Sequence, residues 1–384
     1  MPATAYSKTF AQELDLQQLL ARLREVALTQ VDPKGEVSEA ERAWIRRDVI
    51  CTCCSVDGAL VVRAGRNKTG RLVRQGHFRF RSLTGEDAHH RLCEFYGNET
   101  GQPTGAEKVR FSSTAGSALT RAVGELVSRG IEREVFTSEQ MQAMRRWYFE
   151  AKVASRFKVV ARPEIFTWLA TQARQPSARS ADGPPDDLDA FDPAFGDLPT
   201  FKWRRAAVDE VTRRDQPVVQ RLDGISEASV KTAAKLAAKL DGQDEFDRGA
   251  LRAEYAAALD LAKFIAIHAD LHEPKVPAHR FASVGAPSAL LALSALLLFR
   301  TGYDRRAARR LFVELQSGPS AQDPRRGNII GLNPFHDFDA WRAIKLASDL
   351  TAETGWSFNR FDDINLAEAR LKAAHRTWRA AGRP

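Results

Sequence analysis

The stretch CTCCSVDGALVVRAGRNKTGRLVRQGHFRFRSLTGEDAHHRLC, residues 51–93, contains all four cysteines of the chain and three of its eight histidines. Cys51 and Cys54 have the C-x2-C spacing with which a tight turn presents two thiolates to one tetrahedral metal ion. The other candidate ligands follow in the same stretch and are His77, His89, His90 and Cys93. This clustering predicts one Cys/His metal site.

The predicted ligand set is Cys51, Cys54, His77, His90 and Cys93, in which the two cysteines of the tight turn are the firmest part. Cys53 is an alternative to either of them, and His89 is an alternative to His90, because both histidines reach Cys93 at helical spacing. Zn²⁺ is the expected ion, and four protein ligands predict a structural site, since a catalytic zinc keeps a position for water. The alternative is that the cysteines are small buried apolar residues.

The residues between the candidate ligands predict a β-hairpin followed by a helix. Residues 59–63 and 72–80 have the composition of short strands, and the glycine-bounded segment 65–70 is typical of the turn between them. A helix is expected to begin near Ser82 or Thr84 and to end at Gly97. A bound ion would explain how so short a β-segment stays folded.

The hairpin is strongly basic, since no acidic residue occurs between Asp57 and Glu86. A β-ribbon of this kind can follow a phosphate backbone or enter a major groove. The candidate nucleic-acid contacts are Arg63, Arg66, Asn67, Lys68, Arg71, Arg74, Arg79 and Arg81. The alternative is a solvated hairpin in an arginine-rich protein.

Residues 50–96 resemble the N-terminal zinc segment of CoiA-like competence proteins. The resemblance lies in the Cys-x-x-Cys pair, a basic hairpin with a glycine, a His-Phe pair and a Gly-Glu start before His-His, here Cys51, Cys54, Gly65, His77-Phe78-Arg79-Phe80 and Gly85-Glu86-Asp87-Ala88-His89-His90. It implies a zinc-stabilised module in proteins that handle DNA. Phe80 stands where a second histidine commonly follows in that family, and the nuclease-like domain of the family is not recognisable here. Glu150-Ala-Lys152 has a Glu-x-Lys form but falls on an expected helix.

The whole chain predicts an α+β N-terminal zinc-stabilised module with a short hairpin, followed by an all-α helical-bundle C-terminal domain. Its 384 residues allow two or three domains. The expected divisions are helices over 1–49, the zinc module over 50–97, a mostly helical extension over 98–172, an acidic flexible linker over 173–200 and the all-α domain over 201–384.

Composition narrows the classes of partner and compartment. The net charge of +8 favours anionic partners, nucleic acid first. Four clustered cysteines argue against a disulfide scaffold, and the first ten residues lack the pattern of a signal peptide. The longest apolar run, 286–299, is shorter than the ~20 residues that span a bilayer. We therefore expect a cytoplasmic protein without a membrane partner.

Three functional hypotheses follow. The first is a zinc-stabilised nucleic-acid-binding protein, with DNA favoured, whose residues 201–384 contact a protein partner or a second copy. The second is a metal-dependent nuclease or other DNA-processing enzyme that uses Glu94, Glu150 and Lys152. The third is an interaction protein whose zinc site is purely structural. No catalytic motif decides whether the chain is an enzyme.

Overall fold

The computed structural model describes residues 4–27, 37–63, 65–66, 72–74, 76–97, 118–174, 191–269, 271, 277–281, 285–322, 333–353 and 357–382. The chain forms two compact units, and each is built from two stretches of sequence. Unit 1 contains residues 1–156 and 248–336, and unit 2 contains residues 157–247 and 337–384. The sequence predicts that a linker at 173–200 separates the N-terminal and C-terminal parts of the chain. In the structure, each unit instead combines two stretches that are far apart in the sequence. Most of the expected acidic linker, 175–190, lies outside the described residues.

Unit 1 begins with a three-stranded antiparallel sheet in the order β2-β1-β3. Its strands are β1 (Thr4–Ser7), β2 (Gln12–Asp15) and β3 (Val49–Ile50). The helices α1 (Leu16–Ala27) and α2 (Glu39–Asp48) lie between β2 and β3 in the sequence. The helices predicted over 1–49 are confirmed, and α2 begins at a capping box formed by Ser38 and Glu41. The strands β1 and β2 were not predicted, because each has only four residues and β2 reads Gln-Glu-Leu-Asp.

The predicted hairpin is present as two short antiparallel pairs. Strand β4 (Ala59–Val62) pairs with β7 (His77–Phe80), and β5 (Gly65–Arg66) pairs with β6 (Leu72–Arg74). The prediction of a helix after Ser82 is wrong, because residues 81–97 form consecutive turns. Gly85, with φ +82°, adopts a left-handed conformation that interrupts a right-handed helix. Backbone bonds Ser82 N to Glu86 O and Ala88 N to Phe80 O close the first turn instead.

The rest of unit 1 is helical and surrounds one apolar helix. Its elements are α3 (Ala118–Glu132), α4 (Ser138–Ala154), η3 (Arg248–Leu251), α8 (Arg252–His268), η4 (Ala278–Arg280), α10 (Ser288–Arg300) and α11 (Arg305–Gln316). Helix α10 is buried on all sides, as its sequence predicts, and contacts α3, α4, α8 and α11. Among the described residues, no helix has both the length and the apolar character that crossing a bilayer requires.

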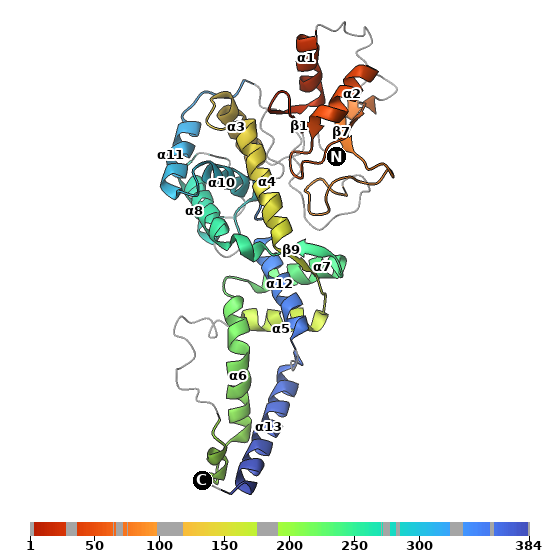
Figure 1. The fold of residues 1–384 in the computed structure, drawn as a ribbon. Coiled ribbons are helices and arrows are strands. Elements are labelled where there is room, and N and C mark those ends of the chain that lie inside the picture. Colours follow the sequence, from red (N-terminus) through yellow and green to blue (C-terminus); the bar gives the residue numbers. More distant parts are fainter. Residues whose placement is uncertain are drawn as a thin grey trace. The chain divides into compact units, whose positions relative to one another are not determined.

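Unit 2 consists of helices with one small two-stranded sheet. Its elements are β8 (Arg156–Lys158, which starts at the unit boundary), α5 (Pro163–Arg174), η2 (Pro193–Asp197), α6 (Trp203–Arg221), α7 (Glu227–Leu240), β9 (Asp244–Phe246), α12 (Phe338–Ala352) and α13 (Arg360–Ala380). Helices α5, α7 and α12 enclose a large apolar core. Helices α6 and α13 lie side by side, and the start of α6 meets the end of α13 (Figure 1).

Candidate metal centre

The first half of the centre is the tight turn between β3 and β4. The amide of Cys51 donates to Val56 O at 2.9 Å, and the amide of Ser55 donates to Cys51 O at 3.1 Å. The amide of Cys53 points at Cys51 Sγ, 3.4 Å away. Ser55 has φ +57°, a left-handed conformation that turns the chain back towards β4. The turn thus holds the sulfurs of Cys51 and Cys54 on one side.

The second half is the loop after β7, and Asp87 closes it. The Asp87 carboxylate accepts from the amide of His89 at 2.9 Å and from the amide of Gly97 at 2.8 Å. It therefore joins the two ends of a loop that contains both His89 and Cys93. The amide of Phe95 lies 3.5 Å from Cys93 Sγ. Each half thus offers a backbone donor two residues after a cysteine, which favours the thiolate form of that sulfur.

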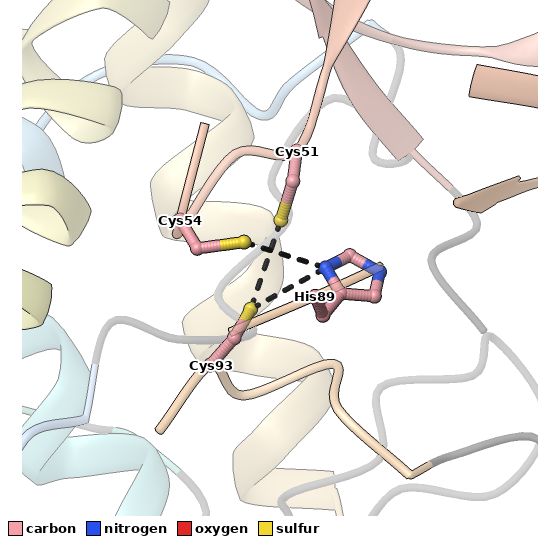
Figure 2. Close-up of side chains that lie close together, drawn as sticks. All are labelled: Cys51, Cys54, His89 and Cys93. Carbon is pink, nitrogen blue, oxygen red and sulfur yellow. Dashed lines mark hydrogen bonds between the residues drawn. The ribbon is translucent and has the colours of Figure 1, made fainter. Parts of the chain in front are cut away.

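The two halves bring four ligand atoms together, from Cys51, Cys54, His89 and Cys93 (Figure 2). Cys51 Sγ lies 3.8 Å from Cys93 Sγ, and His89 Nδ1 lies 3.5 Å from Cys54 Sγ and 3.6 Å from Cys93 Sγ. A tetrahedral ion with metal–sulfur bonds of about 2.3 Å and metal–nitrogen bonds of about 2.0–2.1 Å has S–S edges of about 3.8 Å and S–N edges of about 3.6 Å. These three separations match edges of such a tetrahedron, and all four ligand atoms lie within 4.8 Å of one another.

The surroundings of the cluster are apolar. Cys51, Cys93 and His89 are buried, Cys54 is half-buried, and the His89 ring packs edge-on against Phe80 at 5.0 Å. Burial raises the pKa of the Cys51 and Cys93 thiols, whereas hydrogen bonds with those two thiols lower the pKa of Cys54. A metal ion bound by these residues would favour the thiolate form at every cysteine of the cluster.

The structure gathers only part of the predicted ligand set. Cys51, Cys54 and Cys93 are in the cluster, together with His89, which the sequence left as the alternative to His90. His90 is exposed, accepts from the amide of Leu92 at 3.1 Å and lies outside the cluster. Its predicted pairing with Cys93 assumed a helix, and the turns present His89 instead. Neither His77, which is buried on β7, nor the buried Cys53 is among the four clustered residues.

Two ion pairs, each with a buried cation, link this region to α4, and no sequence pattern predicts them. Lys152 Nζ lies 2.8 Å from the carboxylate of Glu94, and Arg145 lies 2.6 Å from that of Glu13. Burial alone would lower the pKa of Lys152, but the Glu94 carboxylate raises it above its ordinary value. Glu94 and Lys152, two residues of the nuclease hypothesis, therefore form an ion pair, whereas Glu150 is exposed. This arrangement fits a structural tie between loop and helix.

The predicted nucleic-acid contacts are described in part. Arg63 is exposed directly after β4, Arg79 is half-buried on β7, and exposed Arg81 donates to Gly85 O within the turn. The backbones of Arg66 and Arg74 lie in the β5–β6 pair. Asn67, Lys68 and Arg71 lie outside the described residues.

Comparisons with protein-family models, with curated proteins and with solved structures gave no match to this chain. Four protein ligands would complete a tetrahedral shell, so the arrangement suits an ion that holds two chain segments together.

Proposed function

We propose that the cluster binds one structural Zn²⁺ ion. Three thiolates and an imidazole in tetrahedral arrangement are a ligand set that zinc prefers, and a full protein shell leaves no place for a substrate or a reactive water. The apolar surroundings and the two backbone amides at the sulfurs suit such a site.

We further propose that this ion anchors a nucleic-acid-binding ribbon, with DNA favoured. One observation carries the proposal: Cys51 and Cys54 lie just before β4, and His89 and Cys93 lie just after β7. The ion therefore clamps the two chain segments that meet at the Ala59–Phe80 end of the β4–β7 pair. The chain between these strands carries most of the acid-free basic segment. A clamp at the base of a short ribbon holds its cations in place for phosphate contacts.

The helices from residue 201 onwards are proposed to serve contact with a protein partner or a second copy of the chain. They contain no part of the metal cluster. Their long α6–α13 pair belongs to unit 2, whereas the ribbon belongs to unit 1.

The zinc proposal is tested by elemental analysis of freshly purified protein. We expect one zinc per chain, and its loss in the Cys51→Ser/Cys54→Ser and His89→Asn variants. The matched controls are Cys53→Ser, in the same turn, and His90→Asn, the neighbouring histidine, and both should keep the ion. A protein without zinc, or equal loss in the controls, contradicts the assigned shell.

The nucleic-acid proposal is tested by anisotropy titration of a labelled DNA duplex at two salt concentrations. The Lys68→Gln/Arg71→Gln variant should weaken binding and reduce the slope of log affinity against log salt by about two, one for each lost phosphate contact. The control, Lys235→Gln/Lys239→Gln, removes the same charge from exposed positions of α7. Salt-insensitive binding, or the same loss in the control, rejects the ribbon as the contact.

A further inference from the structure

The end of the α6–α13 pair carries a second set of features typical of a binding site. We call it the hairpin tip and define it as residues 191–213 and 368–382. There the short helix η2 is fixed against α13: the His375 ring nitrogen Nδ1 donates to Pro193 O at 2.8 Å, and Arg379 pairs with Asp197 at 2.9 Å. Gly196 packs so closely that an added Cβ would lie 2.6 Å from the His375 ring. These contacts hold η2 in a defined position against α13.

A hollow of about 490 Å³ opens at the tip, beside the first turns of α6. Aromatic rings form much of its lining, from Phe191, Phe195 and Phe201. Two of these rings are fixed, since Phe191 and Phe201 pack on each other at 5.9 Å and on Trp203 at 5.8 and 4.8 Å. Phe195 is 46% exposed, so its ring is available to a ligand.

The tip is also rich in cations. Lys202, Arg205 and Arg213 line the hollow, together with Asp209 and Glu210. Residues 368–382 contain four arginines and lysines, which are Arg370, Lys372, Arg376 and Arg379, and one acidic residue, Glu368. Arg205 and Arg213 pair with Asp209 and Glu210, but within the described residues Lys202, Arg370 and Arg376 form no ion pair. The excess of positive charge complements an anionic ligand.

We propose that the hairpin tip binds single-stranded nucleic acid. An unstacked base enters the hollow and stacks on Phe195, while Lys202 and the arginines of α13 contact the phosphates. Exposed aromatic rings beside a basic surface are the combination that holds single strands without base-specific contacts. A duplex satisfies the cations but keeps its bases stacked, so it gains nothing from the hollow. The site lies in unit 2, and it does not depend on whether the zinc ribbon binds duplex.

The test is an anisotropy titration of the full chain with a fluorescein-labelled oligothymidylate. Phe195→Ala should weaken binding about tenfold, since stacking on one ring contributes about 1–3 kcal/mol per base. Lys202→Gln should weaken binding and reduce the salt slope by about one. The matched controls are Leu366→Ala, an apolar residue of α13 that is 53% exposed, and Lys235→Gln on α7. Neither control should change the affinity.

Further titrations distinguish this site from the ribbon, and single-stranded nucleic acid from other anionic ligands. Lys68→Gln/Arg71→Gln should leave the Phe195-dependent part of the single-strand affinity intact, so that failure of one proposal is seen independently of the other. Unchanged affinity in Phe195→Ala overturns the base-stacking site. Equal losses for duplex and single strand also overturn it. Binding of a polyglutamate peptide that depends equally on Phe195 would assign the tip to an acidic protein instead.

Discussion

Residues 49–97, which we call the metal module, and the core of unit 2 differ in how much regular structure and apolar surface they contain. Around the metal cluster the paired strands β4 to β7 are two to four residues long, and the loop after β7 has no regular structure apart from its turns. In unit 2, helices α5, α7 and α12 each have at least twelve residues and bury a continuous apolar surface that includes Trp341, Leu169 and Ile344.

The two regions obtain their stability from different sources. Strand pairs this short do not fold alone, because their few hydrogen bonds do not offset the entropy lost on ordering the chain. Under the proposed function, the metal module therefore depends on the bound ion. The α5–α7–α12 core depends on burial of apolar area, at roughly 25 cal/mol per Å². Each source of stability can therefore be removed by a separate substitution.

The largest expected effect is the loss of the ion. In Cys51→Ser/Cys54→Ser we expect residues 49–97 to unfold, because structural zinc binding contributes apparent free energies of about 10–16 kcal/mol in zinc-finger peptides. Hydrogen exchange followed by mass spectrometry should show fast exchange in these residues and unchanged protection in α5, α7 and α12. Cys53→Ser is the control. Protection that persists in 49–97 would show that apolar packing alone holds the module.

The converse perturbation removes apolar packing from unit 2. Trp341 is 1% exposed within the core of α12. Trp341→Ala should destabilise this core by about 3–5 kcal/mol through lost burial and the cavity it leaves. Denaturant unfolding checks the free energy, and elemental analysis should find the zinc content unchanged. Leu366→Ala, at a largely exposed position, should cost little; a zinc content that falls with the Trp341 change would mean that the regions share one cooperative unit.

The same contrast explains what the sequence can predict. Helices over 1–49 and in the C-terminal part were predicted, because apolar periodicity and capping are local signals. The cysteine turn at 51–54 was also predicted, since its ligand spacing is local. All four residues of the cluster were among the named candidates.

The choice of histidine was not predictable, because it depends on the backbone between His89 and Cys93. Spacing of three or four residues suggests a helix, but Gly85 and the double acceptor Asp87 produce turns. An Asp two residues before His89 is the available signal, since such side chains favour turns over helices. The interleaving of the two units has no local signal at all, because it arises from contacts between residues far apart in the sequence.

Backbone conformation at the two metal-binding loops is expected to affect the stability of the metal module by a smaller amount. Ser55 occupies a left-handed conformation at φ +57° that costs an L-residue about 1–2 kcal/mol. Ser55→Gly should stabilise the module by up to about 1 kcal/mol, because the gain is reduced by the greater freedom of glycine in the unfolded chain. Gly85→Ala, at φ +82°, should destabilise by a similar amount although its Cβ would meet no neighbour. Exchange rates of residues 49–97 in zinc-loaded protein measure both; the same sign for both changes contradicts this interpretation.

The smallest expected effect is electrostatic and concerns the helices beside the module. Glu41 accepts from Arg24 at 2.7 Å and from the amide of Ser38 at 2.7 Å. Burial acts to raise the pKa of Glu41, but the bonds from Arg24 and Ser38 outweigh it, so this pKa is lowered. A lowered folded-state pKa adds stability above the unfolded value of about 4.3, and that stability is lost as the pH falls through the folded value.

Glu41→Gln keeps an acceptor for the capping box but removes the charge, so it should cost about 0.5–1 kcal/mol near pH 7. The cost should persist down to about pH 5 and disappear at lower pH, where the wild-type carboxyl is also neutral. Unfolding of both proteins across this range checks the prediction, and a cost that does not change with pH would assign the role of Glu41 to capping alone.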